Sequence, residues 1–425
     1  MGLILLFGVF FFSLIAGVPV AFALGIATVL TFVYEGLPLF VAFQRIMSGI
    51  SVFSLLAIPF FIFAGELMLQ GGIAVRLVRL ASAAVGNIRG GLGVVNVASS
   101  MLFGGISGSA VADTSALGSI MIPVMKEKKY DADYAVNVTV TSSIAGVVIP
   151  PSHNMILYAV AAGGVSVSSL FIAGVVPGIL MCVCLALAAY LVAVRRGYAS
   201  EAFPGWQALA ISFVVAIPGL LTAVIIVGGV LSGVMTVTES GAFGAIYAIV
   251  VTALVYRELT WERFKTAVLA SVRTTSLVMM LVATATAFAY LLTLYRVPDT
   301  LAASITSISD NPLMILLLIN IVLLLLGMIM DMAALILICT PIFLPLARDL
   351  GMDPIQFGII IMMNLGLGLC TPPVGACLFV GCVVGGVRMD HVVRTIWPFY
   401  LAIIASLLLV TYVPAISMFL PNLMR

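Results

Sequence analysis

One pattern of polar residues, glycines and prolines occurs twice in this chain, each time inside long apolar segments. The first copy holds Asp131, Gly146, Pro150-Pro151 and Gly163-Gly164, and the second holds Asp353, Gly368, Pro372-Pro373 and Gly385-Gly386. The spacing is identical in both copies, with 19 positions from the Asp to the first Pro and 13 from that Pro to the first Gly. Paired membrane repeats that Gly and Pro interrupt at matching positions indicate a transport fold with its site near the bilayer midplane.

A second block precedes each copy. The segment from Asp113 to Pro123 aligns with the segment from Asp331 to Pro341 through a shared Asp, Ala-Leu, Ile and Pro. In this alignment the stretch that joins the two blocks differs by four residues between the copies. We therefore expect Asp113 and Asp331 to occupy equivalent positions in two related halves.

The composition places the chain in a membrane, because 63% of its 425 residues are hydrophobic and only 8% are charged. Nine segments have about the length and apolar character that a helix needs to cross a bilayer core. The predicted crossings are 2–33, 52–70, 131–163, 168–195, 205–230, 236–256, 275–296, 354–386 and 393–420. The first segment lacks the basic start of a signal peptide, so we interpret it as a retained span.

Two further apolar segments, 91–125 and 312–347, are too long for one helix crossing and carry a polar break in the middle. We predict that both are re-entrant helical hairpins, whose tips must be buried in protein or line a wet cavity. The double prolines should unwind the crossings 131–163 and 354–386, because proline removes an N–H group and clashes with the preceding turn.

The basic residues predict the orientation. When the crossings are counted through, most Lys and Arg residues fall on one side, and the other side keeps only Arg45, Arg296, Arg348 and Arg425. The positive-inside bias makes the crowded side cytoplasmic, with the N terminus in the cytoplasm and the C terminus in the periplasm. The same count makes the two hairpins open to opposite faces. The predicted fold class is therefore an all-α polytopic membrane protein with inverted repeats, two re-entrant hairpins and two broken helices.

Several function classes find no support in the residues. The six cysteines lie among apolar residues without a CxxC pair or a nearby His, which favours small core residues over a disulfide or a metal site. A net charge of +2 gives no indication of nucleic acid binding. The chain has no HExxH motif, no clustered Cys and His, and no P-loop. We therefore expect no enzyme. A scaffold that only binds other membrane subunits would have no use for matched helix breaks.

Four polar, helix-breaking loops lie in apolar surroundings, at 104–110, 148–154, 326–332 and 370–375. Freed carbonyls in a dry environment need partners, and carbonyls together with Ser or Thr hydroxyls suit a hard cation such as Na⁺. Half-helix N-termini that point inward suit a carboxylate. We therefore predict two related sodium sites with an organic anion between them. The candidate sodium ligands are Ser107, Ser109, Asp113, Asn154, Gly327, Asp331, Thr371 and Gly375.

The candidate substrate contacts come from the same loops and are Ser107, Ser152, His153, Asn154, Thr371 and Pro373. His153 could donate to the substrate or carry a proton, or it could be a polar residue that the fold itself satisfies. No Lys or Arg falls inside a predicted crossing core. The anion would then have to be held by dipoles, hydroxyls and amides, unless Arg45 or Arg296 reaches inward.

Asp113 and Asp331 are candidates because a carboxylate near the membrane centre costs about 2.5–3.5 kcal/mol on insertion scales and by default marks a function. Each could instead cap the second helix of its hairpin, and capping is compatible with cation binding. Glu66 and Glu239 also lie in apolar stretches, but near predicted span ends, where a solvated or ion-paired position is at least as plausible. We leave both out of the predicted site.

Five strings make the chain resemble a known family. They are Phe63-Ala-Gly-Glu-Leu-Met68, the hairpin string from Gly104 to Gly118, Ile149-Pro-Pro-Ser152, Thr236-Val-Thr-Glu-Ser-Gly-Ala242 and Leu369-Cys-Thr-Pro-Pro-Val-Gly375. Over nearly the whole chain they resemble the large membrane subunit, DctM type, of tripartite ATP-independent periplasmic (TRAP) transporters. The resemblance implies a Na⁺-driven importer of small carboxylates, such as C4-dicarboxylates or sialic acid, in the bacterial inner membrane.

The resemblance also implies two partners, a four-helix small membrane subunit (DctQ type) and a periplasmic substrate-binding protein. It implies an elevator fold like that of the ion transporter superfamily, in which a transport domain slides against a scaffold. The family's cation sites are similar in kind to the clusters above. They transfer most directly to Ser107, Ser109, Asp331 and Thr371, and less directly to Asp113 and Asn154.

Under this resemblance the chain divides into seven parts. Residues 1–70 and 168–256 are scaffold helices, 71–90 and 257–274 are amphipathic arms, 91–167 and 275–392 are the halves of the transport domain, and 393–425 is the C-terminal helix. The arms have the composition of helices that lie in the headgroup plane, although ordinary cytoplasmic loop helices would look alike. Coupling to protons through Asp113, Asp331 and His153 is the alternative to coupling to sodium.

Overall fold

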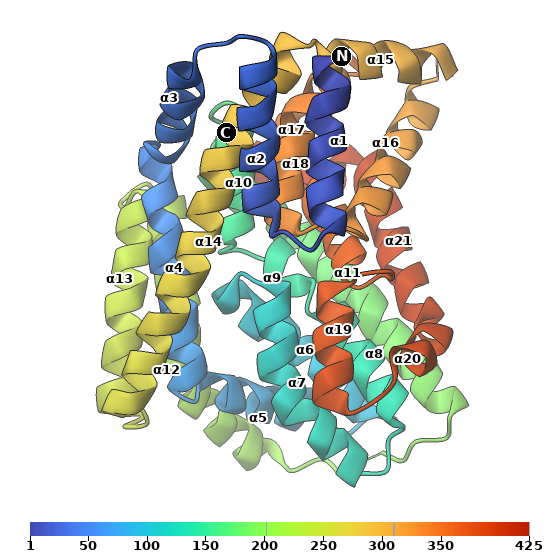
Figure 1. The fold of residues 1–425 in the computed structure, drawn as a ribbon. Coiled ribbons are helices and arrows are strands. Elements are labelled where there is room, and N and C mark those ends of the chain that lie inside the picture. Colours follow the sequence, from blue (N-terminus) through green and yellow to red (C-terminus); the bar gives the residue numbers. More distant parts are fainter. Residues whose placement is uncertain (201, 309–310, 425) are drawn as a thin grey trace.

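The computed structural model describes residues 1–200, 202–308 and 311–424. Within these residues the regular structure is helical, and one isolated backbone bridge joins Arg89 to Ser200 (Figure 1). In the same part of the chain, six helices are long and apolar enough to cross a membrane, or up to nine if each bent pair counts as one span. The predicted all-α polytopic class is confirmed.

The segment predicted as the first hairpin folds back on itself. Helices α6 (Gly91–Ser107) and α7 (Ala110–Glu127) pack against each other, and only Gly108 and Ser109 separate them. Gly108 has φ +64°, which favours glycine, and the Ser109 hydroxyl accepts a hydrogen bond from the Ala112 amide at 3.4 Å. The glycine ends one helix and the serine caps the next, so the hairpin prediction is confirmed.

The second predicted hairpin is also present. It consists of α16 (Pro312–Gly327) and α17 (Met332–Asp349), and the Asp331 carboxylate caps α17 by accepting a hydrogen bond from the Ala333 amide at 2.9 Å. Helices α6 and α7 lie in the lower half of Figure 1, whereas α16 and α17 lie in its upper half. The two hairpins therefore open to opposite ends of the molecule, and the repeats are inverted as predicted.

Both double prolines interrupt helices, as predicted. The first broken crossing consists of α8 (Ala132–Ser142), α9 (Ala145–Val148) and α10 (His153–Ala161), with a bend of 52° before α10. The second consists of α18 (Pro354–Leu369) and α19 (Ala376–Gly385), with residues 370–375 between them. The peptide bonds Pro150-Pro151 and Pro372-Pro373 are cis. Each break is a stretch of non-helical backbone flanked by half-helices.

The helix boundaries correct the register of the repeats. Helix α7 begins at residue 110 and α17 at 332, and they end at 127 and 349, so both boundaries differ by 222 positions (332 minus 110, and 349 minus 127). The two double prolines are 222 positions apart as well (372 minus 150). The four-residue difference of the sequence alignment therefore disappears.

In this register the counterpart of Asp331 is Ser109, and both residues cap the second helix of their hairpin. Asp113 lies one turn inside α7, and its counterpart in α17 is Leu335. The predicted equivalence of Asp113 and Asp331 is wrong. It matched two identical residue types, whereas the structure matches the positions at which the helices begin.

The predicted first crossing, 2–33, is in fact two short helices. Helices α1 (Gly2–Ile15) and α2 (Val20–Tyr34) lie side by side, joined by a turn that contains Gly17 at φ +81° and Pro19 (Figure 1). At 1.5 Å per residue each helix is about 21–23 Å long, which is shorter than a bilayer core of about 30 Å. The prediction of one retained span is wrong, because the turn carries no polar residue that would have marked it.

This reversal also determines where the next helix starts. After α1 and α2 the chain is back at the end of the molecule where it began, and α3 (Leu39–Ile50) starts there (Figure 1). The described chain finishes with α22 (Pro414–Leu423). The sides of the membrane on which the two termini lie stay a prediction.

The remaining helices are η1 (Phe53–Leu56), α4 (Ala57–Gln70), α5 (Ile73–Val85), α11 (Val167–Arg195), α12 (Trp206–Leu231), α13 (Val237–Val250), η2 (Val251–Val255), α14 (Trp261–Leu294), α15 (Val297–Ile308), α20 (Met389–Thr395) and α21 (Trp397–Tyr412). Helix α5 lies across the lower end of the molecule in Figure 1, as an arm in the headgroup plane would. Helix α14 is continuous, since Thr260 caps it and no Gly or Pro interrupts it. The predicted boundary between an arm and a span near residue 274 is therefore not a helix break.

The helices pack in two groups. In one group α4 packs on α13 and α14, α14 packs on α2 and α3, and α12 packs on α13. In the other, α11 packs on α6, α18, α21 and α22, while α7 packs on α8 and α19. Helix α11 makes little contact with α12, although the sequence analysis grouped 168–195 with the scaffold helices.

A polar cluster fixes the end of α11 to the second group. The Arg196 guanidinium donates to the carboxylates of Asp131 at 3.0 Å and Asp133 at 2.8 Å. The Tyr198 hydroxyl donates to Asp131 at 2.6 Å, and the Thr395 hydroxyl donates to Asp133 at 2.7 Å. These bonds join the end of α11 to the start of α8 and to α20, so α11 is tied to the first broken helix.

We predict that Gly368→Ala destabilises the fold. The new methyl group would lie 2.5 Å from the carbonyl carbon of Gly327, which is backbone and cannot rotate away. Overpacking of this kind costs about 1–3 kcal/mol, measurable as a lower unfolding temperature of the detergent-purified protein.

Gly228→Ala is the matched control, because a methyl group there meets no atom within 4 Å. Alanine is favoured over glycine inside a helix by about 1 kcal/mol, so this variant should be as stable as the wild type or more so. Equal stability of Gly368→Ala and the wild type would contradict the close packing at Gly327.

Candidate functional site

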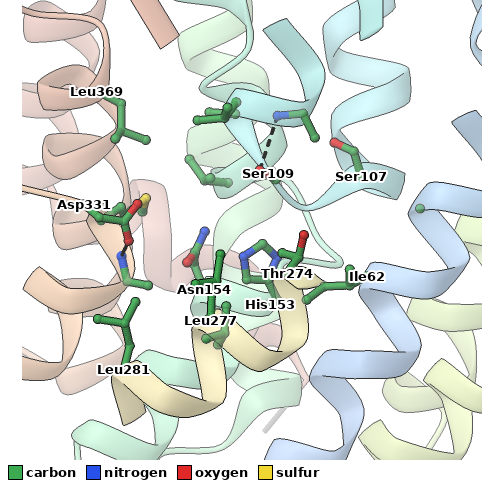
Figure 2. A pocket seen from close by; sticks show the side chains of 18 of the residues that line it. Ile62, Ser107, Ser109, His153, Asn154, Thr274, Leu277, Leu281, Asp331 and Leu369 are labelled. Carbon is green, nitrogen blue, oxygen red and sulfur yellow. Dashed lines mark hydrogen bonds between the residues drawn. The ribbon is translucent and has the colours of Figure 1, made fainter. Parts of the chain in front are cut away.

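A cavity of about 520 Å³ lies where the two hairpin tips meet the first helix break. One wall comes from the first tip, the first break and the second tip, and the facing wall comes from α4, α14 and the start of α2 (Figure 2). The polar lining residues are Glu66, Ser107, Ser109, His153, Asn154, Thr274 and Asp331. The cavity therefore lies between the two packing groups of helices.

The first tip rests directly on the first break because glycines allow the two backbones to approach. A methyl group on Gly104 would lie 2.7 Å from the amide nitrogen of Gly146, and one on Gly105 would lie 3.0 Å from the Pro150 carbonyl. A methyl group on Gly146 would meet the Ser107 hydroxyl oxygen at 3.4 Å and the Ser109 carbonyl oxygen at 3.5 Å. Oxygen atoms of the tip therefore gather beside α9, the short helix that leads into the double proline.

The second tip rests on the second break in the same way. Gly327 packs against Gly368, and the Val374 amide donates to the Met328 carbonyl at 3.2 Å. Thr371 donates its hydroxyl hydrogen to the Leu367 carbonyl at 2.7 Å, so its oxygen lone pairs stay available. Gly375 directly precedes α19 and has φ +47°, which favours glycine.

Several buried oxygens near the first tip have no hydrogen-bond partner within the described protein. They are the hydroxyl oxygens of Ser99, Ser107, Thr114 and Ser152 and both carboxylate oxygens of Asp113. Asp113 is fully buried, and its neighbours include the side chains of Ser100, Cys182 and Cys377. Buried polar atoms are costly to leave unpaired, so this region has capacity for a cation, a proton or ordered water.

The two predicted aspartates have different local roles. Asp331 lines the cavity and caps α17, as the capping hypothesis expected. Asp113 does not cap α7, because Ser109 does so, and it does not line the cavity. The two carboxylates therefore belong to different environments.

The structure gathers five of the predicted site residues at the cavity, namely Ser107, Ser109, His153, Asn154 and Asp331. Figure 2 shows His153 and Asn154 at the centre, Ser109 above them and Asp331 at the left, across the cavity from Ser107. The other predicted residues lie outside the cavity lining, and they are Asp113, Ser152, Gly327, Thr371, Pro373 and Gly375. Gly327, Thr371 and Gly375 instead belong to the contact between the second tip and the second break.

Sequence reasoning missed the wall that faces the tips. Ile62 and Glu66 of α4 and Thr274, Leu277 and Leu281 of α14 line the cavity. Glu66 stood in a recognisable string and was left out because it lies near a span end. No sequence pattern marked the α14 residues, because their approach to the tips depends on how the two groups of helices pack.

Neither Lys nor Arg lines the cavity among the residues that the structure describes. The two arginines considered for an inward reach lie elsewhere, and the Arg45 guanidinium stacks on the Tyr290 ring at 4.4 Å. No cluster of three or more His, Cys, Asp or Glu side chains suited to a metal ion occurs within the described chain. The polar groups of the cavity are hydroxyls, an amide, an imidazole, two carboxylates and the N-termini of α7, α10 and α17.

Comparison with known proteins gives the family. Residues 7–416 match the family model described as "Tripartite ATP-independent periplasmic transporter, DctM component". The chain belongs to the DctM component family of TRAP transporters. It is 43% identical to protein YgiK of Salmonella typhimurium over 425 residues, which cover 99% of this chain and 97% of that protein.

Two further likenesses support the assignment. The DctM chain is 38% identical to the sialic acid TRAP transporter large permease protein SiaM of Vibrio cholerae, over 96% of each chain. Among solved structures, the YdaH transporter of Alcanivorax borkumensis has a TM-score of 0.64 with 14% identity and covers 88% of both chains. At this identity the second likeness concerns the fold alone. The protein is thus a multi-span membrane permease subunit with a transporter fold.

We predict that Tyr400→Phe weakens the second break of this DctM subunit. The Tyr400 hydroxyl donates to the Cys370 carbonyl at 2.6 Å, and both groups are buried at the point where α18 ends. Loss of the donor leaves a buried carbonyl unpaired, which costs about 1–3 kcal/mol and should lower the thermal unfolding temperature.

Tyr190→Phe is the control, since the Tyr190 hydroxyl has no hydrogen bond within the described chain and the side chain is 38% exposed. Its unfolding temperature should stay at the wild-type value. If both variants unfold at that value, Tyr400 does not hold the break.

Proposed function

We propose that this chain is the sodium-coupled large permease subunit of a TRAP transporter that imports small organic acids by an elevator mechanism. The observation that supports it most strongly is the direct contact between each hairpin tip and the matching helix break. At these contacts backbone and hydroxyl oxygens gather in buried surroundings, where a hard cation can replace missing hydrogen-bond donors.

The first proposed sodium site lies between the first tip and the first break. The Ser107 hydroxyl oxygen has no protein partner, and the Ser109 carbonyl lies beside it near Gly146. Asn154 stands at the start of α10 and faces the same cavity. Asp113, with both oxygens unpaired, supplies negative charge behind this site.

The second proposed sodium site lies between the second tip and the second break. Gly327 and Asp331 come from the tip, while Thr371 and Gly375 come from the break. The Asp331 carboxylate accepts one hydrogen bond as a helix cap, and the Thr371 hydroxyl donates to a carbonyl. The Asp331 carboxylate and the Thr371 hydroxyl oxygen therefore keep lone pairs that can face a cation. Asp331 places its charge at the tip itself, whereas the carboxylate nearest the first site is Asp113, one turn inside α7.

The proposed place for the organic anion is the cavity between the tips. His153 and Asn154 form the first turn of α10, and the side chain of the preceding residue, Ser152, makes no cap bond there. Uncapped amides at a helix N-terminus, together with the hydroxyls of Ser107 and Ser109, suit a carboxylate. Of the other candidates, Ser152 directly precedes this helix start, whereas Thr371 and Pro373 belong to the second break, and none of the three lines the cavity.

The proposed elevator motion follows from the two packing groups. The hairpins, the broken helices and α11 form one group, α4 and α12 to α14 form the other, and the cavity lies between them. We propose that the first group moves with the substrate against the second, and that α5 and the start of α14 are the arms that connect them.

The proposed assembly includes a small membrane subunit of four helices and a periplasmic protein that delivers the substrate, in the bacterial inner membrane. Small carboxylates, with C4-dicarboxylates and sialic acid as examples, are the proposed cargo, and SiaM of Vibrio cholerae is a relative named for sialic acid. Proton coupling is the second candidate, and the unpaired oxygens of buried Asp113 favour it. Replacing Na⁺ with choline at fixed pH abolishes uptake under sodium coupling and spares it under proton coupling.

We predict that Asp331→Asn raises the Na⁺ concentration needed for half-maximal uptake by liposomes that hold this chain, its small subunit and a delivering protein. The amide keeps the helix cap, because Asn and Asp cap comparably well, but it removes the charge. Asp331→Ala should raise that concentration too and also lose about 0.5–2 kcal/mol of stability from the missing cap.

A matched pair tests the neighbouring ligand. Thr371→Ala should raise the required Na⁺ concentration, whereas Thr371→Ser keeps the hydroxyl and should restore the wild-type value. Unchanged Na⁺ dependence in both Asp331→Asn and Thr371→Ala, at normal expression, would remove these residues from the site.

A further inference from the structure

A second cavity, of about 490 Å³, lies away from the site on the outer face of the helix bundle. It forms where α5, α6 and α12 meet, and its walls are almost entirely apolar. The lining residues are Leu80, Ala81, Ala84 and Val85 of α5, Ala98, Met101 and Leu102 of α6, and Trp206, Leu209, Ala210 and Phe213 of α12. We call it the α5–α6–α12 groove.

The groove exists because two helices are held apart by a third. Helix α5 packs extensively on both α6 and α12, whereas α6 and α12 touch each other little. The residues that α5 and α6 present to the gap include three alanines, Ala81, Ala84 and Ala98, which leave space that larger side chains would fill. Trp206 and Phe213 border the gap with 79% and 51% of their surfaces exposed.

The position of the groove makes a phospholipid its natural occupant. Helix α5 lies across the end of the molecule, with buried apolar residues such as Leu77 and Leu80 on one face and the exposed Arg79 on the other. Amphipathic helices of this composition lie in the headgroup plane, and here the apolar face of α5 packs on the protein core. Trp206 begins α12 beside this plane, as interfacial tryptophans do. The groove therefore extends from the headgroup level into the hydrocarbon region.

The charges beside the groove favour an anionic headgroup. Arg79, Arg89 and Arg195 are exposed and make no ion pair within the described chain. The backbone bridge between Arg89 and Ser200 brings the chain after α5 next to the segment that leads into α12. Exposed basic side chains at the membrane surface attract anionic lipids.

We propose that the α5–α6–α12 groove binds one acyl chain of an anionic phospholipid. The lipid tail lies between α6, which carries the first hairpin, and α12 of the other packing group. It fills a gap that protein side chains leave open, so the first hairpin meets a fluid chain at this point instead of a fixed protein surface.

Native mass spectrometry of the detergent-purified complex of this chain with its small subunit tests the proposal. The wild type should retain one phospholipid that Ala84→Phe and Ala210→Phe lose, because each new ring fills the groove from an exposed lining position. Val214→Phe is the matched control, since Val214 is 63% exposed on α12 and does not line the groove. It should retain the lipid.

A second measurement does not depend on recovery of the variants in equal amounts. Phosphatidylglycerol added to the delipidated complex should raise the unfolding temperature of the wild type and of Val214→Phe, and have no such effect on Ala84→Phe and Ala210→Phe. Phosphatidylcholine should have a smaller effect on the wild type, and Arg89→Gln should reduce the difference between the two lipids.

Two outcomes would overturn the proposal. One is equal lipid retention and equal stabilisation in the groove-filling variants and in the control, which would leave only non-specific surrounding lipid. The other is efficient cross-linking of Ala210→Cys to the small subunit, which would show that protein covers the groove. Neither outcome bears on sodium coupling, so the proposed transport function stands or fails separately.

Discussion

The whole architecture depends on one constraint, which is that backbone N–H and C=O groups cannot stay unpaired inside a bilayer. This chain breaks two crossing helices at Pro150-Pro151 and Pro372-Pro373 and turns two hairpins at membrane depth. Each exposed stretch of backbone is covered by another, because the first tip lies on the first break and the second tip on the second. Glycines at Gly104, Gly146, Gly327 and Gly368 make that approach possible.

The covering is incomplete, and the gaps define the site. Ser107, Ser152 and Asp113 keep oxygens without protein donors, while the amides at the start of α10 face a cavity. Unpaired acceptors suit cations and unpaired donors suit anions. Under the proposed function, the same loops would hold both kinds of solute without any Lys or Arg among the described residues of the cavity wall.

The sequence predicted those parts of the fold that polar residues, Gly and Pro mark inside apolar segments. Both hairpins and both broken helices follow from such marks, and so do Ser107, His153, Asn154 and Asp331 as cavity residues. The inverted relation follows from the number of crossings counted between the hairpins. The turn at Gly17 and Pro19 was not predicted because it has no polar residue. The register of the repeats was predicted wrongly because the alignment matched Asp113 with Asp331, whereas the helix starts match Ser109 with Asp331. The wall formed by Glu66, Thr274 and Leu277 depends on long-range packing, which no local pattern contains.

The corrected register has an electrical consequence. At equivalent points of the two halves stand a neutral cap, Ser109, and a charged one, Asp331. The first half has its carboxylate at Asp113 instead, one turn inside α7 and outside the cavity lining, whereas Asp331 lines the cavity itself. The two halves are thus geometrically related, but their negative charges stand at different depths, at the cavity wall in one half and behind it in the other.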